Sequence, residues 1–307
     1  MPGEISPTDY IELDGTRLRF RLEGAAGAPV VVFGNSLATS LEMWDPQVPA
    51  LASRYRLLRF DTRGHGRSAA PPPPYAMDRL AADVTGLMDR LAIARAVYVG
   101  LSLGGMVGQY LGATRPERFT GLVLAATALR MDRKLWDDRV ATVLRDGVAP
   151  QVAPSLERWF TPAFRAAHPE QMTRIQAMIE QTAREGYAGC AAAIRDMALE
   201  QLAPTIRLPT LVLVGDEDPS TPPAQAEESE PEAAAAPEEA APEALPEEAA
   251  EEPPPEATTP PQQVAAAPPT PRVRRDRPAP EAPQAPEVPT TSDPFTEEIA
   301  ALIDRSA

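Results

Sequence analysis

Short, mostly apolar runs recur along the first two thirds of the chain, and they limit the possible folds more than any other feature of the sequence. These runs lie at residues 29–33, 55–60, 96–100, 121–126 and 210–215. Strands that are apolar on both faces are typical of the interior of a parallel sheet. An amphipathic helix at residues 77–91 and a helix that begins at Leu103 separate the runs. The pattern therefore predicts an α/β fold, with a mostly parallel sheet and helices on both of its faces.

Two further parts of the chain add a predicted hairpin and a predicted cap to this sheet. Alternating segments at residues 11–13 and 18–22, joined by a turn at Gly15, predict a β-hairpin at the start of the sheet. About eighty mostly helical residues separate the last two strands, which is too many for a simple crossover. We therefore expect a core over residues 1–226 that includes a helical cap at about 131–200, over the carboxyl edge of the sheet.

The composition changes after this core. Residues 227–294 consist mostly of Pro, Ala, Glu, Gln and Thr. Such a segment has too little apolar surface to offset the conformational entropy that ordering would cost. We expect it to be disordered. Residues 295–307 are expected to form a short helix, because their large apolar residues have helical spacing.

Charge and cysteine content exclude several classes of function. The net charge is −15, but residues 227–256 hold twelve Glu and no Lys or Arg, which leaves −3 on the rest of the chain. This balance gives no reason to expect a nucleic-acid partner. No apolar run approaches the length of a membrane span, and the first residues do not resemble a signal peptide. Cys190 is the single cysteine, which excludes an internal disulfide and a cysteine-rich zinc site. We expect a cytoplasmic protein with no membrane partner, no metal and no cofactor.

A nucleophile is predicted at Ser102. It is the centre of the segment Gly100-Leu101-Ser102-Leu103-Gly104, which lies directly between a predicted strand and a predicted helix. In a G-x-S-x-G motif the serine occupies a sharp, strained turn, and the positions two residues away must be small so that strand and helix can approach. The motif in this context is typical of the α/β-hydrolase fold. An ordinary glycine-rich turn is the alternative.

Acyl transfer at a serine also needs hydrogen-bond donors for the oxyanion that forms. The backbone N–H of Leu103, at the start of the helix, is one candidate. The second is the N–H of Leu37, in the loop that follows the strand at residues 29–33. A plain turn is the alternative interpretation of that loop.

The acid of a catalytic triad should follow a later strand in this fold. The run at residues 210–215 leads into Asp216, Glu217 and Asp218. We prefer Asp218, because Pro219 ends regular structure there. Asp216 and a solvated acidic turn are the alternatives.

A general base is missing from its expected place. In this fold a His should follow the acid, yet the two histidines of the chain, His65 and His168, both precede it. His65, between two glycines, is expected in a loop near the entrance of the site, and His168, before a proline, as a cap residue. Residues 227–294 contain no side chain that could replace an imidazole at neutral pH.

Six segments of the chain resemble the 3-oxoadipate enol-lactonases. They are NSLATSLEMWDPQ, DTRGHGRS, GLSLGGMVGQYLG, PERFTGLVLAATA, GYAGCAAAIRDMAL and GDEDPSTPP. The resemblance covers about residues 11–226, and its most specific part is the cap segment at residues 186–199. It implies that Ser102 is the nucleophile, that Asp218 is the acid, and that the two candidate N–H groups are the oxyanion donors.

The resemblance returns at residues 293–307, which look like the C-terminal helix of the family. A family member would join the two similar parts by a helix, a last strand and a short loop that carries the catalytic His. Here a longer Pro/Ala/Glu stretch joins them. We therefore predict that the last strand and its His are missing.

The resemblance implies hydrolysis of 3-oxoadipate enol-lactone to 3-oxoadipate without a cofactor. The partner is then a small lactone that carries a carboxylate, and Arg133 or Arg195 of the cap is a candidate to orient that group; solvated surface charge is the alternative role for each arginine. Two other functions remain open. One is an esterase or perhydrolase that acts on other small acyl compounds, and the other is a pseudo-hydrolase that binds a small acid without turning it over.

Overall fold

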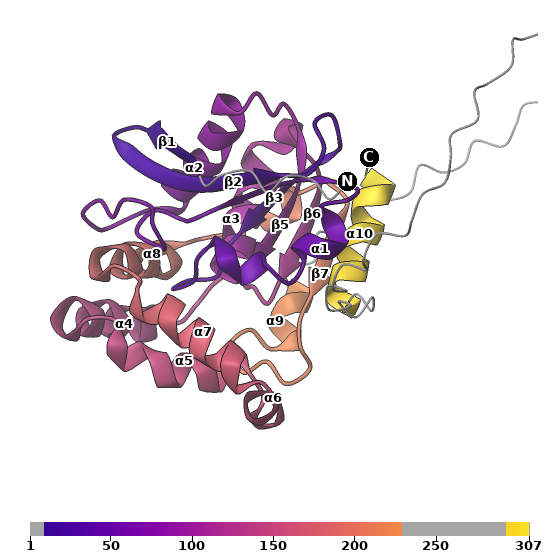
Figure 1. Ribbon diagram of the computed structural model, residues 1–307. Coiled ribbons are helices and arrows are strands. Elements are labelled where there is room, and N and C mark those ends of the chain that lie inside the picture. The colour runs from indigo at the N-terminus through magenta and orange to yellow at the C-terminus, as the bar shows by residue number, and fades with distance from the viewer. Residues whose placement is uncertain (1–8, 229–292, 307) are drawn as a thin grey trace, which may run out of the picture. The chain divides into compact units, whose positions relative to one another are not determined.

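The computed structural model describes residues 9–228 and 293–306, and these residues contain a seven-stranded sheet (Figure 1). In chain order the strands are β1 (Asp9–Leu13), β2 (Thr16–Glu23), β3 (Val30–Gly34), β4 (Arg56–Phe60), β5 (Ala96–Leu101), β6 (Phe119–Ala125) and β7 (Thr210–Leu213). Their order in the sheet is β1-β2-β4-β3-β5-β6-β7. The β1–β2 and β2–β4 pairs are antiparallel, and every pair from β4 to β7 is parallel. The predicted fold class, a mostly parallel sheet of the α/β-hydrolase type, is confirmed.

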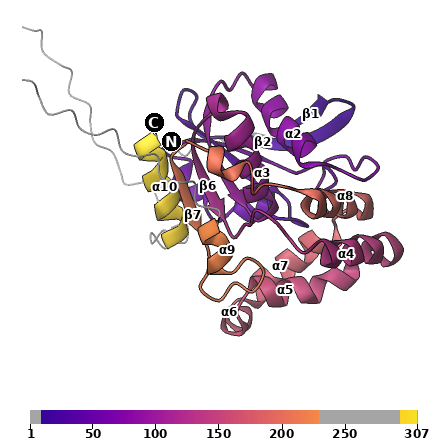
Figure 2. The same ribbon diagram turned by 180° about the vertical axis from the view of Figure 1, so that it is seen from behind.

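The helices fall into a group around the sheet and a group in the cap. The first group is η1 (Leu41–Trp44), α1 (Val48–Leu51), α2 (Met77–Arg90), α3 (Leu103–Thr114), η2 (Pro116–Arg118), η4 (Ala203–Thr205), α9 (Pro223–Glu228) and α10 (Pro294–Ser306). The cap group is α4 (Arg133–Asp146), η3 (Ala149–Gln151), α5 (Val152–Trp159), α6 (Pro162–Ala167), α7 (Pro169–Glu180) and α8 (Arg184–Asp196). Figures 1 and 2 show the cap helices gathered at one end of the sheet.

Two apolar clusters cover the two faces of the sheet. Successive side chains of a strand point to opposite faces, and Val32 and Tyr98 belong to the cluster that includes α2 and α3. Their neighbours Val31 and Val97 belong to the second cluster, which includes η1, α1 and α10. Helix α10 also lies beside β6. The central strands are therefore buried on both faces, as their apolar runs predict.

The cap is joined to the core through helix α8. A Cβ atom on Gly64, in the loop after β4, would lie 2.1 Å from the Cα of Gly186 on α8, so the two backbones touch. Gly64 has φ of 76°, which favours glycine at this point as well. The N–H of Tyr75 donates to the carbonyl of Gly189 at 3.2 Å. Helix α8 in turn packs along α4, which extends the core into the cap.

Three predicted boundaries change in the part of the chain after residue 209. Strand β7 ends at Leu213, two residues before the end of its apolar run. Helix α9 extends through Glu228, so Glu227 is helical and is not the start of a disordered segment. Helix α10 begins at Pro294 rather than at Phe295. The remaining predictions for this part, disorder over residues 229–292 and the loss of the last strand, fall outside the described residues.

Within the described ranges, no helix combines the length and the apolar character that a membrane crossing requires.

Candidate active site

Ser102 occupies a strained turn between β5 and α3. Its φ of 54° and ψ of −113° lie outside the regions that L-residues prefer. The turn is held by two backbone hydrogen bonds, in which Ser102 N donates to Ala125 O at 2.8 Å and Met106 N donates to Ser102 O at 3.0 Å. Thr127 Oγ1 also donates to Ser102 O, at 3.0 Å. The half-buried serine therefore has the geometry expected of a nucleophile at a strand–helix turn.

The glycines that flank Ser102 allow this turn to form. A Cβ atom at Gly100 would lie 2.3 Å from Gly104 O, and a Cβ atom at Gly104 would lie 2.2 Å from Gly34 O. Both distances are far too short for nonbonded atoms. The predicted requirement for small residues at these two positions is thus met by direct backbone contact between β3, β5 and α3.

The two candidate oxyanion donors lie on a loop and on the start of a helix that touch each other. Gly104 N donates to Asn35 O at 3.0 Å, which joins the start of α3 to the loop that carries Leu37. The N–H groups of Leu37 and Leu103 donate to no acceptor among the described residues. Both residues are buried, at 5% and 1% exposure. The two N–H groups are therefore free to bind an oxyanion, and that role stays a prediction.

Asn35 has a structural role that the sequence did not indicate. Its Nδ2 donates to Phe60 O at 2.7 Å, and its Oδ1 accepts from Trp44 Nε1 at 2.9 Å. The side chain, 1% exposed, thus joins the end of β4 to η1. Because the backbone of the same residue binds Gly104, Asn35 connects the loop that carries Leu37 to the turn at Ser102.

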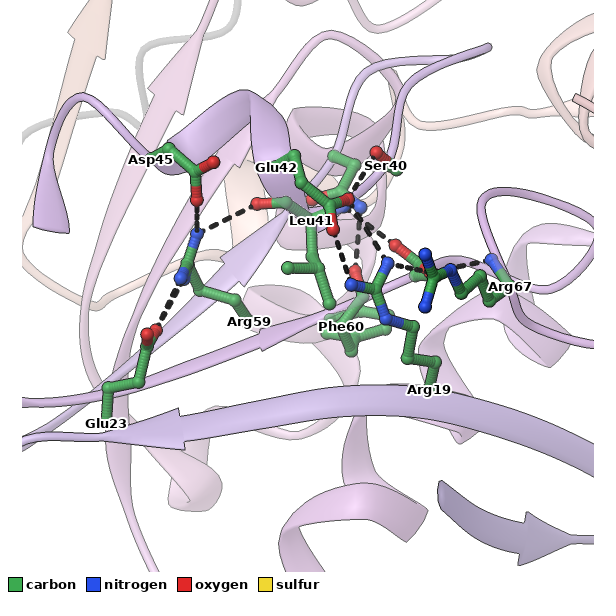
Figure 3. A network of polar contacts seen from close by, with 11 residues as sticks. Arg19, Glu23, Ser40, Leu41, Glu42, Asp45, Arg59, Phe60 and Arg67 are labelled. Carbon is green, nitrogen blue, oxygen red and sulfur yellow. Dashed lines mark hydrogen bonds and ion pairs between the residues drawn. The ribbon is translucent and has the colours of Figure 1, made fainter. Parts of the chain in front are cut away.

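A network of buried charged side chains binds the start of η1, which follows the loop that carries Leu37 (Figure 3). Asp61 Oδ1 accepts from Leu41 N at 2.7 Å, while its Oδ2 accepts from Arg19 Nη1 at 3.1 Å. Arg59 Nη1 donates to Leu41 O at 3.1 Å, and Arg59 Nη2 pairs with Glu23 at 2.5 Å. Leu41, the first residue of η1, is therefore fixed at both its N–H and its carbonyl.

Glu42 is a more exposed member of this network and binds Arg19. Arg19 forms an ion pair with Glu42, and Ser40 Oγ donates to Glu42 Oε2 at 2.6 Å. Burial of the carboxylate opposes its ionisation, but the hydrogen bonds from Arg19 and Ser40 outweigh burial and lower the pKa of Glu42 to about 2. Glu42 is therefore ionised across the physiological range.

The loop after β7 orients Asp218. Its carboxylate accepts from Ser220 N at 2.7 Å, Thr221 N at 3.1 Å and Thr221 Oγ1 at 2.8 Å. Asp216 is exposed, whereas Asp218 is half-buried. The preference for Asp218 over Asp216 stays a prediction, and the fixed carboxylate of Asp218 agrees with it.

Neither histidine forms a hydrogen bond with Ser102 in the part of the chain that the structure describes. His65 is in a loop, as expected, but it is 1% exposed and does not line an entrance. The loop is buried because Gly64 packs against Gly186 of the cap. His65 Nδ1 donates to Arg63 O at 3.1 Å, its Nε2 has no partner among the described residues, and burial lowers the pKa of His65 to about 4. His168 ends α6 and precedes α7, with its ring 4.3 Å from that of Phe164.

The two arginines proposed to orient a substrate already bind carboxylates of the cap. Arg133 pairs with Asp196 at 2.9 Å, and its side chain is 68% exposed. Arg195 pairs with Asp196 at 2.5 Å and with Asp137 at 2.9 Å. A role for either arginine in substrate binding stays a prediction.

An open pocket of about 360 Å³ lies where the cap meets the loop after β7. It is lined by Arg130, Met131, Asp132, Leu135, Ser220 and Gln225. Ser220 also holds the Asp218 carboxylate, so this pocket borders the candidate acid. Among residues 9–228 and 293–306, no group of three His, Cys, Asp or Glu side chains is arranged to hold a metal ion.

The fold and the strained serine turn together define a class of protein. Residues 29–238 match the alpha/beta hydrolase fold family, and the chain belongs to that family. The chain is 35% identical over 220 residues to 3-oxoadipate enol-lactonase 2 of Acinetobacter baylyi, an alignment that covers 71% of this chain and 82% of that protein. The enol-lactonase from Burkholderia xenovorans superimposes with a TM-score of 0.71 at 40% identity, covering 72% of this chain and 86% of that one. A hydrolase from Pseudomonas aeruginosa has a TM-score of 0.70 at 41% identity over 72% of this chain and 85% of its own. The resemblance seen in the sequence is confirmed.

Proposed function

We propose that this chain is a serine hydrolase of the 3-oxoadipate enol-lactonase type, which converts 3-oxoadipate enol-lactone to 3-oxoadipate in the β-ketoadipate pathway of aromatic compound degradation. The observation that carries the proposal is the strained turn at Ser102 beside two free backbone N–H groups. The similarity to lactonases from two organisms supports the choice of substrate. The buried, unpaired Cys190 fits a cytoplasmic protein.

The proposed reaction passes through an acyl-enzyme. Ser102 Oγ attacks the lactone carbonyl, and the N–H groups of Leu37 and Leu103 stabilise the oxyanion. Collapse of this intermediate breaks the ring C–O bond, and the enolate that leaves takes up a proton to become a ketone. Water then attacks the acyl-enzyme, which releases 3-oxoadipate and restores the Ser102 hydroxyl.

The step that this chain performs poorly is removal of the Ser102 proton. No His follows Asp218 in the sequence, and His65 and His168 are engaged elsewhere. Loss of the base in a serine hydrolase costs on the order of a millionfold in turnover, although binding and oxyanion stabilisation survive. We therefore expect the chain to bind the lactone and to hydrolyse it very slowly.

The test is hydrolysis of the enol-lactone by the purified chain beside its Ser102→Ala variant. We expect slow turnover by both, because loss of the base alone costs about as much as loss of the whole triad. Fast hydrolysis that depends on Ser102 would show that another group acts as base, and a His65→Gln variant would then identify or exclude that residue. Fast hydrolysis at equal rates in the chain and in Ser102→Ala would contradict a role for Ser102.

A second candidate is a hydrolase of other small acyl compounds. The chain is 28% identical over 228 residues to a non-heme chloroperoxidase of Streptomyces lividans and 28% identical to a thermophilic esterase from Thermogutta terrifontis. A spectrophotometric comparison of the lactone with simple aryl esters and with peracid formation separates these activities.

A third candidate, favoured by the missing His, is a pseudo-hydrolase that binds a small acid without turnover. A fluorophosphonate probe distinguishes it from a working hydrolase, because a serine without a base should react slowly or not at all.

A further inference from the structure

The loop that carries Leu37 is held in a strained conformation. Ala38, the next residue, has φ of 64°, a left-handed value that is unfavourable for a residue with a Cβ atom. Such a conformation persists only where the surrounding structure enforces it. The contacts that enforce it here also determine where the Leu37 N–H points, and they therefore bear on the candidate oxyanion site.

Helix η1 supplies part of these contacts. Met43 Sδ accepts from Ser36 N at 3.4 Å and from Thr39 Oγ1 at 3.0 Å. Trp44 Nε1 donates to Asn35 Oδ1 at 2.9 Å. Residues before and after the candidate oxyanion donor are therefore bound by two consecutive side chains of one short helix.

Trp44 is bound in turn by the C-terminal helix. Its ring stacks on that of Phe295 in α10, with the ring centroids 6.2 Å apart and 15° between the ring planes. Its centroid also lies 4.9 Å from that of Phe33, near the end of β3. Trp44 is 1% exposed, and Phe295 is half-buried. The indole that binds Asn35 is thus itself packed against a ring from the other end of the chain.

The same contacts continue to the turn that holds the nucleophile. The carbonyl of Asn35 accepts from Gly104 N at 3.0 Å, and Gly104 lies two residues after Ser102. Packed side chains and hydrogen bonds in direct succession are the kind of structure that couples distant parts of a protein. Such a succession runs here from Phe295 through Trp44 and Asn35 to the start of α3.

We propose that helix α10 positions the loop that carries Leu37 for oxyanion binding, and that Phe295 and Trp44 are the positioning residues. Both act through Asn35. Helix α10 is joined to the rest of the chain through residues 229–292, so non-covalent contacts such as this stack determine where it docks. The inference rests on the proposed function for the oxyanion role of the Leu37 N–H, and on the contacts of Trp44 for the coupling.

The experiment measures amide hydrogen exchange in the full chain without substrate. The reporters are Gly104 N–H, which binds Asn35 O, and Thr39 N–H, which binds Ser36 O at 3.3 Å. Phe295→Ala removes the stacked ring, and we expect exchange at both amides to become at least tenfold faster. Phe295→Tyr, which keeps the ring, should leave exchange as slow as in the unaltered chain.

The matched control is Ile303→Ala on the same helix. Ile303 is fully buried in the same apolar cluster, about 12 Å along the helix axis from Phe295. Its loss should lower the unfolding midpoint. Because Ile303 lies away from Trp44, exchange at the two reporter amides should rise less than threefold.

Trp44→Phe tests the next contact in the series. It keeps a ring beside Phe295 but removes the N–H that binds Asn35 Oδ1. Exchange at the two reporters should again become at least tenfold faster, while exchange within α10 should stay unchanged, because the helix remains docked.

Three results would overturn the inference: unchanged exchange at both reporters in Phe295→Ala, an acceleration in Ile303→Ala as large as that in Phe295→Ala, or unchanged exchange in Trp44→Phe. If Phe295→Ala does not unfold cooperatively, Phe295→Leu, which keeps apolar bulk without a ring, replaces it in the comparison and should still exchange faster than Phe295→Tyr.

The outcome is separable from that of the proposed function. Fast lactone hydrolysis at equal rates in the chain and in Ser102→Ala would remove the oxyanion role of Leu37, but it would leave the exchange results standing, because no substrate is present in that experiment. Ser102-dependent hydrolysis in a chain whose reporter amides do not respond to Phe295→Ala would keep the proposed function and remove the coupling.

Discussion

At the scale of single residues, backbone contact decides which side chains the Ser102 turn tolerates. The hydrogen atom at the Cα of Gly104 faces the carbonyl of Gly34, and no side chain fits between them. The positive φ of Ser102 adds strain on the order of 1–3 kcal/mol, which the surrounding hydrogen bonds must offset. A turn built in this way has little freedom to accept larger neighbours.

We predict that Gly104→Ala destabilises the fold by about 1–3 kcal/mol, because its Cβ would lie 2.2 Å from a backbone oxygen that cannot move freely. Urea unfolding measures the change. Gly86→Ala is the matched control, since its Cβ would meet only the flexible side chain of Leu13 at 3.1 Å and alanine favours a helix. Equal stability of Gly104→Ala and the unaltered chain would contradict the close contact.

A second prediction at this scale concerns the pH dependence that Glu42 introduces. Its pKa is about 2 in the folded chain, against an ordinary value of 4.5. A depressed pKa means that the ionised carboxylate stabilises the fold above pH 4.5, and that this contribution is lost as the pH falls from 4.5 through 2. Because its side chain is 31% exposed, we expect solvent to reduce the effect to about 1–2 kcal/mol.

Glu42→Gln should therefore destabilise the chain at pH 7 and have a smaller effect at pH 3. Denaturant unfolding at both values checks this, with the exposed Glu117→Gln as control. A penalty that is the same at pH 7 and pH 3 would assign the stabilising role of Glu42 to packing and not to its charge.

At the scale of secondary structure, helix α10 is the element whose packing joins the most distant parts of the described chain. Ile299, Leu302 and Ile303 lie in the apolar cluster on the α1 face of the sheet. Tyr55 Oη donates to Asp304 Oδ1 at 2.6 Å, and Arg54 pairs with the same carboxylate. The C-terminal helix is therefore part of the core.

We predict that Ile299→Ala destabilises the whole fold by about 2–4 kcal/mol, because Ile299 is fully buried and its loss leaves a cavity against the sheet. Glu298→Ala, on the exposed side of the same helix, should change the stability by less than about 0.5 kcal/mol. Thermal unfolding measures both. A cooperative transition that is identical for Ile299→Ala and the unaltered chain would show that α10 does not contribute to the core.

The elements themselves were predictable because each leaves a local pattern in the sequence. Apolar runs predicted every strand from β3 to β7, and the spacing of apolar residues predicted α2 and α10. The motif around Ser102 predicted the strained turn, since the geometry of that turn depends on adjacent residues.

Contacts between distant residues could not be predicted in this way. Arg19, Asp61 and Leu41 lie on three different elements, and no periodic pattern relates them. The glycines beside His65 suggested a loop near the entrance of the site, but Gly64 instead allows the cap to pack on this loop, and His65 is buried. The paired state of Arg195 likewise depends on Asp137, which lies on another helix of the cap.

At the scale of the whole molecule, all of the proposed catalytic groups except the general base lie in one part of the chain. The nucleophile turn, the oxyanion loop and the candidate acid follow β5, β3 and β7 and are all present in residues 9–228. The base is the missing part, since no His follows Asp218 anywhere in the chain. Three of the four proposed functions are thus assigned to residues that the structure describes.

This division leads to a prediction about restoring catalysis. Replacing residues 229–292 by the corresponding segment of a 3-oxoadipate enol-lactonase, with its His, should raise Ser102-dependent lactone hydrolysis by several orders of magnitude, because base removal alone costs up to about a millionfold. The rate should fall again in the grafted chain when Ser102→Ala or Asp218→Asn is added, and it should remain low in a graft whose His is replaced by Gln. A graft that folds, as judged by its unfolding midpoint, but hydrolyses the lactone no faster than the His→Gln graft would show that the Ser102 turn and the Asp218 loop of this chain are not positioned for a shared base. A graft that gains activity without any loss in Asp218→Asn would assign the acid to another residue, with Asp216 as the first to test.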